Sequence, residues 1–174
     1  MLDADDLRAA IRDVSDFPQP GIVFKDITPI LGNAELFQTA IRLLAETAHG
    51  KDISKVVGID ARGFIFAAAV ADRLKCGFVP IRKKGKLPWT TKEEAYSLEY
   101  GEAVVEIHQD SVSPGENILL VDDLLATGGT AAAAVRLLDQ LEANIVSVSF
   151  LIELSGLNGR EKLNDHIITS ILTY

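Results

Sequence analysis

Apolar and polar positions along this chain alternate between short strand-like runs and stretches with helical spacing. Short apolar runs predict strands at residues 56–59, 78–81, 118–121, 145–152 and 167–172. Stretches with helical spacing lie between or beside them, at 64–75, 130–141 and, as a short helix, 157–163. Strands separated by helices predict βαβ units, and therefore an α/β fold with a mainly parallel central sheet flanked by helices.

Three further patterns complete the expected layout. Residues 2–14 carry apolar side chains at helical spacing, which predicts a short amphipathic helix before the chain is broken by Pro and Gly at 17–21. Asn33 is a good N-cap for a second helix that runs to Gly50. The segments 95–100 and 103–107 alternate well enough to form an antiparallel pair around Gly101.

Composition narrows the class of protein. The chain has 174 residues, of which 48% are hydrophobic, so one domain (1–174) with a sizeable core is expected and intrinsic disorder is excluded. The longest apolar run, Gly63 to Ala71, is far shorter than the ~20 residues of a membrane span. The acidic start is not expected to act as a signal peptide. A single cysteine, Cys76, allows no intrachain disulfide and suggests a reducing cytoplasm.

Charge is distributed unevenly along the sequence. The whole chain has a net charge of −8, which argues against a general nucleic-acid binder because such proteins rely on a basic surface. Residues 82–92, however, hold five cations and no acidic residue. This segment contains Gly85 and Pro88 and lacks an apolar period, so we expect a basic loop. One concentrated basic loop in an acidic protein favours a small anionic ligand.

The richest candidate chemistry follows the apolar run 118–121. In parallel sheets ligands bind at the carboxyl ends of the strands, and here that end carries Asp122 and Asp123. A loop with two glycines then opens a helix, and the amides of such a loop and helix start can surround a phosphate. Thr127 and Thr130 add hydroxyl donors, and Thr130 is a plausible N-cap. The two carboxylates could accept hydrogen bonds from a pair of vicinal hydroxyls or from water on a hydrated metal ion.

The segment is neither a Walker A loop nor a dinucleotide fingerprint, because neither glycine pattern is present. Val-Asp-Asp-Leu-Leu-Ala-Thr-Gly-Gly-Thr at 121–130 instead resembles the motif with which type I phosphoribosyltransferases bind phosphoribosyl pyrophosphate (PRPP), in the form typical of their adenine-using members. Further matches extend the resemblance over about residues 15–165, at 17–27, 58–64, 82–88, 98–101, 153–154 and 159–160.

The resemblance implies a reaction and an architecture. Adenine and PRPP would give AMP and pyrophosphate with Mg²⁺, in a protein without nucleic-acid or membrane partners. The implied fold has a small N-terminal hood, to which about residues 1–33 contribute, a mobile loop and a homodimeric assembly. The resemblance leaves two alternatives to an adenine-using enzyme. One is an enzyme for hypoxanthine, guanine, xanthine or orotate, and the other is a regulatory protein that senses PRPP. The 121–130 text favours adenine.

The resemblance also implies which residues hold PRPP. Asp122 and Asp123 would bind the ribose hydroxyls, and Arg62 with the neighbouring turn amides would bind the pyrophosphate. The 5′-phosphate would lie on the loop and helix start formed by Ala126, Thr127, Gly128, Gly129 and Thr130. No protein ligand is expected to bind Mg²⁺ directly, since the ion would arrive with PRPP and keep waters near the two aspartates. A non-proline cis peptide is expected at Asp60–Ala61.

The resemblance assigns closure over PRPP and proton transfer to other residues. Arg82, Lys83 and Lys86 match the cations of the mobile loop, one of which would serve the neighbouring subunit's site, and Lys86 is counted with the catalytic residues. Glu99 is the expected general acid/base, and Arg62 is also expected to take part in catalysis. The neighbouring Tyr100 is expected to bind PRPP.

Recognition of the base is implied for four residues. Backbone groups near Val23 and Lys25 would recognise adenine, Phe24 would stack on its ring, and Leu154 would line its pocket. Lys25 is frequently Arg in relatives, which matters only if the side chain makes the contact.

Overall fold

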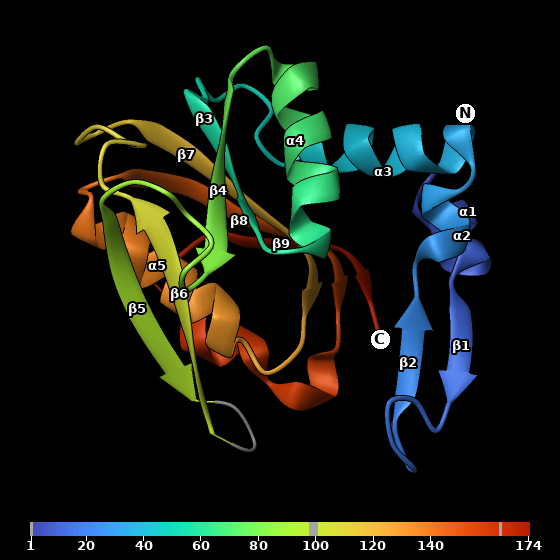
Figure 1. Cartoon of the computed structure of the whole chain (residues 1–174). Coiled ribbons are helices and arrows are strands. Elements are labelled where there is room, and N and C mark those ends of the chain that lie inside the picture. The colour runs from blue at the N-terminus through green and yellow to red at the C-terminus, as the bar shows by residue number, and fades with distance from the viewer. Residues whose placement is uncertain (1, 98–100, 164) are drawn as a thin grey trace.

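The computed structural model describes residues 2–97, 101–163 and 165–174 (Figure 1). A seven-stranded sheet runs through it in the order β5-β6-β4-β3-β7-β8-β9. The strands from β4 to β9 in this order are parallel, whereas β6 pairs antiparallel with β4 and β5 antiparallel with β6. Their bounds are β3 (Lys55–Ile59), β4 (Gly77–Lys83), β5 (Thr91–Ser97), β6 (Glu102–His108), β7 (Asn117–Leu125), β8 (Asn144–Glu153) and β9 (Ile168–Thr173). The predicted α/β class with a mainly parallel sheet is confirmed.

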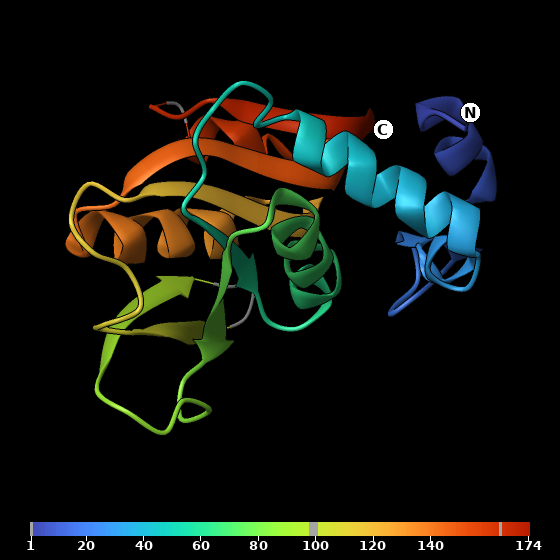
Figure 2. The ribbon, with the colours of Figure 1, turned by 90° about the horizontal axis from the view of Figure 1, so that it is seen from above.

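Helices cover both faces of this sheet. Alternate residues of β7 divide between two cores: Ile118 and Leu120 face the cluster that includes α5 (Gly129–Gln140), and Leu119 and Val121 face the cluster that includes α3 (Ala34–Glu46) and α4 (Arg62–Leu74). Figure 2 shows α5 between the strands β7 and β8 and the β5–β6 pair. Burial on both faces explains why the central strands read as continuous apolar runs.

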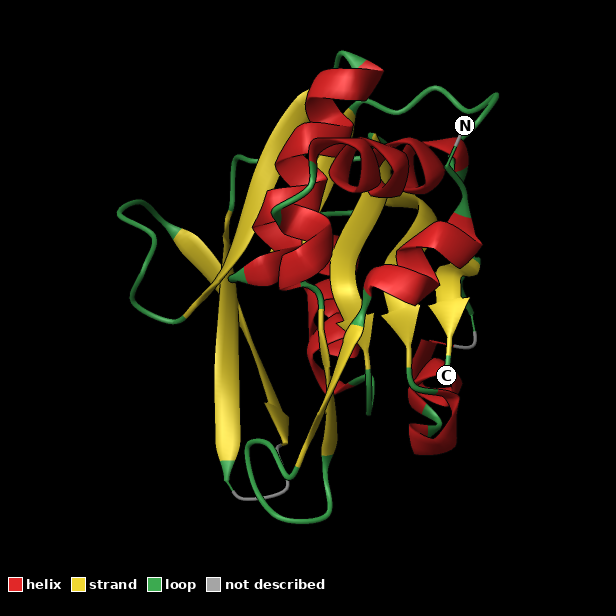
Figure 3. Ribbon diagram, turned by 90° about the vertical axis from the view of Figure 1, so that its right-hand side faces the viewer, coloured by secondary structure: helices red, strands yellow, loops and turns green. Residues whose placement is uncertain are grey.

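Residues 2–31 build a small N-terminal unit, the hood, whose helices pack against the core. It contains α1 (Ala4–Ala10), the antiparallel pair β1 (Arg12–Ser15) and β2 (Val23–Asp26), and α2 (Thr28–Leu31). Its two-stranded sheet makes no ladder with the central sheet. Figure 3 looks from the hood side and shows the β1–β2 hairpin at the same end of the molecule as the carboxyl ends of the central strands.

Two predicted helices are corrected by the structure. The helix expected to reach Val14 ends at Ala10, because Val14 pairs with Phe24 in the β1–β2 ladder and this pairing overrides a period that either element could satisfy. Residues 157–163 form no single helix. A left-handed residue, Asn158 (φ 54°), separates two 3₁₀ turns, η1 (Ser155–Leu157) and η2 (Gly159–Leu163). Among the described helices, none has the length and apolar character to cross a membrane.

Candidate active site

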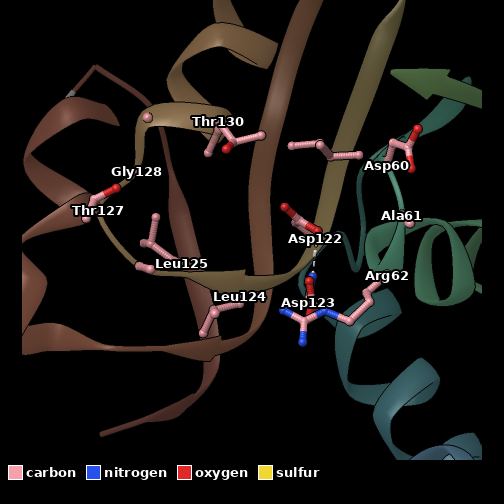
Figure 4. Close-up of a pocket in the computed structure, with 14 residues that line it drawn as sticks. Asp60, Ala61, Arg62, Asp122, Asp123, Leu124, Leu125, Thr127, Gly128 and Thr130 are labelled. Carbon is pink, nitrogen blue, oxygen red and sulfur yellow. Dashed lines mark hydrogen bonds and ion pairs between the residues drawn. The ribbon is translucent and has the colours of Figure 1, made fainter. Parts of the chain in front are cut away.

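A cavity of about 390 Å³ opens at the carboxyl end of β7 (Figure 4). The turn 59–62 forms one wall and the continuous segment 122–131 forms the rest. The structure therefore brings together most of the residues singled out for PRPP: Arg62, Asp122, Asp123, Ala126, Thr127, Gly128, Gly129 and Thr130.

The two carboxylates lie where the sheet opens. β3 accompanies β7 only as far as Val121, whereas β8 continues beside β7 to Leu125. Asp122 and Asp123 therefore lie inside β7, which continues past them to Leu125, whereas they were expected at the very end of the strand. Because the β3 side of β7 is unpaired from this point, the strand exposes its edge to the turn at 60–62. The carboxylates are thus placed by the rigid sheet.

The glycine loop ends in an uncapped helix. Gly128 is the N-cap of α5 with φ 76°, so the helix begins at Gly129 and the expected N-cap role of Thr130 is wrong. No side chain among the described residues caps α5, which leaves the amides of its first turn facing the cavity. Such a helix start attracts an anion through its amides and its dipole.

The loop is braced from behind by a second backbone. A Cβ on Gly128 would collide with the backbone oxygen of Gly159. A Cβ on Gly159 would in turn meet Ala126 O, and would lie 2.9 Å from the Gly128 nitrogen. Glycine is required at both positions because two main chains touch here, so η2 fixes the shape of the loop.

A second uncapped helix start faces the first across the cavity. Ala61 is the N-cap of α4 and Arg62 its first residue, and the Asp60–Ala61 peptide is cis, as predicted. Gly63 allows this turn to approach β7, because a Cβ there would lie 2.5 Å from Asp122 Oδ1. Figure 4 places the aspartates between the two helix starts. The cavity thus offers an anion site at each end and carboxylates in the middle.

The two carboxylates in the middle of the cavity repel each other. Arg62 Nε lies 2.8 Å from Asp123 Oδ2, and the Asp123 amide donates to Asp122 Oδ1 at 2.9 Å. Burial, reinforced by the adjacent Asp123 charge, raises the pKa of Asp122 well above its ordinary value. Burial also raises the pKa of Asp123, against the opposing effect of Arg62. A ligand that donates hydroxyl hydrogen bonds or brings positive charge would relieve this repulsion.

The hood reaches the cavity through an aromatic side chain. The guanidinium carbon of Arg62 lies 5.4 Å from the centre of the Phe24 ring, and Phe17 packs edge-on against Phe24 at 5.2 Å. Leu154 follows β8 and its amide donates to Leu125 O at 2.9 Å. Val23 is half exposed on the same hood strand.

Lys25 sends its side chain to a different part of the hood. Its Nζ lies 2.7 Å from Asp13 Oδ1 and 4.2 Å from the centre of the Tyr174 ring. Because successive residues of a strand face opposite ways, the side chain of Lys25 is directed away from the side on which Phe24 meets Arg62.

The basic loop is shorter than predicted. Arg82 and Lys83 belong to β4 and Lys92 to β5, which leaves only 84–90 outside the strands. Lys84 pairs with Glu93 at 2.7 Å, and Lys92 donates to Gln140 O. β5 and α5 therefore engage the side chains of Lys84 and Lys92.

The predicted loop cations stand apart from the cavity. Arg82 comes nearest: its Nε lies 3.4 Å from Asp60 Oδ2, and its Nη1 donates to Lys86 O at 3.3 Å. Lys83 and Lys86 are exposed and do not line the cavity.

Sequence reasoning missed Glu106, which holds the base of this loop. Its buried carboxylate accepts hydrogen bonds from the amides of Lys86 and Leu87, both at 2.8 Å. Burial acts to raise the pKa of Glu106, but the amides of Leu87, Gly85 and Lys86 bring it below its ordinary value. The available signal was a single carboxylate between the apolar residues Val105 and Ile107. Glu99 and Tyr100 lie outside the described residues.

Within the described residues, no cluster of three or more His, Cys, Asp or Glu side chains could hold a metal ion. The oxygen atoms of Asp122 and Asp123 are nevertheless the kind of group toward which a hydrated Mg²⁺ is drawn.

Comparison with known proteins agrees with this geometry. The chain belongs to the phosphoribosyltransferases, since residues 28–171 match the family described as "Phosphoribosyl transferase domain". Similar relatives are more narrowly named. An adenine phosphoribosyltransferase from Agrobacterium fabrum is 56% identical over 162 residues, covering 93% of this chain and 90% of the relative.

Solved structures resemble the whole chain. The adenine phosphoribosyltransferase of Thermoanaerobacter pseudethanolicus superposes with a TM-score of 0.95 at 44% identity, covering 98% of this chain and 99% of its own. That of Saccharomyces cerevisiae, solved with adenine and an imino-altritol bisphosphate, gives 0.92 at 42% identity, with 97% of each chain covered. The cavity lies in a fold shared over nearly the full length.

Proposed function

We propose that this chain transfers the 5-phosphoribosyl group from PRPP to N9 of adenine, producing AMP and pyrophosphate in purine salvage. The observation that carries the proposal is the order of groups in one cavity: an uncapped helix start, a carboxylate pair, and a second uncapped helix start beside Arg62. PRPP has the matching order of 5′-phosphate, ring hydroxyls and pyrophosphate. The names of the relatives support adenine as the base.

In this proposal the cavity binds PRPP lengthwise. The loop and helix start 126–130 hold the 5′-phosphate, and the carboxylates of Asp122 and Asp123 accept hydrogen bonds from the ribose hydroxyls. Arg62 and the turn amides bind the pyrophosphate, where negative charge gathers as the bond to C1 of the sugar breaks. The same carboxylates stabilise the positive charge that develops on the sugar. Mg²⁺, when bound to PRPP, supplies further charge neutralisation to the leaving pyrophosphate.

The hood supplies the base site. Phe24, which already packs beside Arg62, stacks on the purine ring, and Leu154 lines the opposite wall. Main-chain groups at Val23 and Lys25 recognise the edge of the ring. The engagement of the Lys25 ammonium with Asp13 and Tyr174 supports a main-chain contact. As N9 forms its bond to C1, Glu99 takes the proton from the imidazole ring of adenine, with Tyr100 beside it.

The loop 84–90 closes over bound PRPP and excludes water, which limits hydrolysis. Arg82, Lys83 and Lys86 then approach the pyrophosphate. Arg82 is the pivot, because it already joins the loop to Asp60 at the cavity. In a homodimer one of these cations serves the neighbouring site. We treat residues 1–174 as one catalytic domain, to which about 1–33 contribute the hood, working in the cytoplasm.

The deciding experiment mixes the protein with Mg²⁺ and PRPP and follows pyrophosphate release with adenine, hypoxanthine, guanine, xanthine or orotate, each tested separately. Release with adenine alone is expected. Release with a different base would transfer the proposal to that base. Absence of release with every base would contradict catalysis and favour a PRPP-sensing role.

A further inference from the structure

Tyr174 occupies an unusual position between the hood and the central sheet. Two hood cations lie over its ring: Lys25 Nζ at 4.2 Å from the ring centre and Arg8 Cζ at 4.8 Å. Arg8 also donates from Nη1 to Thr173 O at 3.1 Å. The hydroxyl of Tyr174 is buried and has no hydrogen-bond partner in the part of the chain that the structure describes. The contacts of this side chain are therefore made by the ring.

The main chain of Tyr174 is tied to the opposite side. Its oxygen accepts hydrogen bonds from the Ser155 amide at 2.9 Å and from Ser155 Oγ at 2.7 Å. Its amide donates to Glu153 O at 2.9 Å. These bonds enclose Leu154, the residue assigned to the core wall of the base site. One residue thus fixes the backbone around Leu154 and contacts the side chain of Lys25.

The hood is anchored in the core through its helical parts, where Leu7, Ile27 and Ile30 pack with residues of α3 and α4. Its two-stranded sheet is separate from the seven-stranded one, and an isolated hairpin is only marginally stable. Besides the core anchor at Ile27 and α2, side-chain contacts of β2 itself help to set its orientation. On the face toward the cavity this contact is Phe24 on Arg62, and on the other face it is Lys25 on Tyr174.

We propose that Tyr174 is a positioning residue for the nucleobase, which fixes the hood wall at Lys25 relative to the core wall at Leu154. This inference rests on the proposed function for the identity of the base. The ring of Tyr174 does not touch the reacting atoms. It acts by holding β2 at the spacing that lets the main chain of β2 and the side chain of Leu154 contact one purine.

The test compares Tyr174→Ala with Tyr174→Phe, which keeps the ring and removes only the unpartnered hydroxyl. Tyr174→Ala is expected to raise KM for adenine at least about fivefold, the loss appropriate to two cation–π contacts, while KM for PRPP stays within about twofold. Tyr174→Phe is expected to behave as the unmodified chain. An unchanged KM for adenine in Tyr174→Ala, or an equal rise in both KM values, would overturn the proposal.

A second readout does not depend on activity. Hydrogen exchange of the β1–β2 amides is expected to be at least about fivefold faster in Tyr174→Ala than in Tyr174→Phe, because the hairpin loses its support. Unchanged exchange would contradict the positioning role. If the unmodified chain turned over no base at all, the proposed function would fail, and the exchange data would still decide whether Tyr174 holds the hood.

A poorly folded Tyr174→Ala would not end the test. The double variant Arg8→Met, Lys25→Met removes both cations from the hood side and leaves the sheet and the ring intact. It is expected to reproduce the selective rise in KM for adenine and the faster exchange of β1–β2. A double variant that matches the unmodified chain in both would overturn the proposal.

Discussion

The two ends of the candidate site are built in different ways. The cavity end is fixed mostly by main chain: β7 is held by β8, the 126–128 loop lies against Gly159, and the turn before Gly63 packs closely on Asp122. At the hood end, the helices of the hood pack into the core, and the β1–β2 pair meets the rest of the site through side chains at Phe24 and at Lys25. The difference implies that PRPP meets a preformed site, whereas the base meets a site whose spacing can be adjusted.

The largest effect is expected when a methyl group is added to the 126–128 loop, which is proposed to hold the 5′-phosphate. Gly128→Ala places a Cβ at φ 76° and against the Gly159 backbone, so the loop must move. A displacement of about 1 Å at such a site costs on the order of 100-fold. We expect kcat/KM for PRPP to fall by about that factor, measured by pyrophosphate release.

Gly156→Ala is the matched control for the loop variant, because a Cβ at Gly156 meets nothing within 4 Å. It is expected to keep normal activity. Equal activity in both variants would show that the loop is not braced by η2.

Neutralising the Asp122 carboxylate is expected to change activity and stability in opposite directions. Asp122→Asn keeps the oxygen that accepts from the Asp123 amide and removes the buried charge. We expect kcat/KM to fall at least about tenfold, because one charge-assisted contact to the ribose hydroxyls is lost. The Tm of the free protein at pH 7 is expected to rise by about 2–4 °C, the shift that a gain near 1 kcal/mol gives in a domain of this size.

The pH dependence of that gain follows from linkage. The pKa of Asp122 is raised in the folded state, so the folded protein binds the proton more tightly and loses stability as pH rises above the ordinary value of 3.8 through the raised one. The difference in Tm between Asp122→Asn and the unmodified chain should therefore vanish below pH 3.8 and be full above the raised pKa. Asp139→Asn, at an exposed position on α5, should change neither property. A lower Tm in Asp122→Asn at pH 7 would refute the account of strain in the cavity.

The mobile-loop hypothesis makes a smaller prediction at Glu106. Glu106→Gln weakens the hydrogen bonds to the amides of Lys86 and Leu87, so we expect about threefold to tenfold faster tryptic cleavage within 83–86 and a similar rise in KM for PRPP. Because the pKa of Glu106 is lowered in the fold, its stabilising contribution is present above the ordinary value of 4.5 and is lost as pH falls through the lowered one. Glu102→Gln, exposed on the same strand, is the control. Cleavage at equal rates in the two variants would exclude an anchoring role for Glu106.

The smallest effect is expected at the base. Lys25→Arg should change KM for adenine by less than about twofold, because the side chain contacts Asp13 and Tyr174 and leaves recognition to the main chain. Initial rates at varied adenine would measure this. A tenfold change in either direction would mean that the side chain reads the base.

The same contrast explains what the sequence could predict. The 118–131 segment encodes its own local geometry, so the strand, carboxylates, loop and helix were all predictable within a few residues. Its two errors, the extra length of β7 and the N-cap at Gly128, depend on how far β8 accompanies β7 and on contact with Gly159. Local periodicity does not predict which distant segments will contact this one.

The hood and the loop base were harder for the same reason. Val14 fits a helix or a strand, and only its pairing with Phe24 decides. Glu106 and Tyr174 are ordinary residues in apolar strands until the fold brings the loop amides or the hood cations to them. The roles of Glu99 and Tyr100 remain predictions from the resemblance.

Calorimetric titration of Mg²⁺–PRPP into three proteins, without any base, tests the separation of the two ends most directly. The unmodified chain and Tyr174→Ala are expected to bind PRPP with the same Kd within about twofold, and Gly128→Ala to bind about 100-fold more weakly. If Tyr174→Ala lost PRPP affinity as severely as Gly128→Ala, or if Gly128→Ala bound normally, the division into a preformed phosphate end and an adjustable base end would be contradicted.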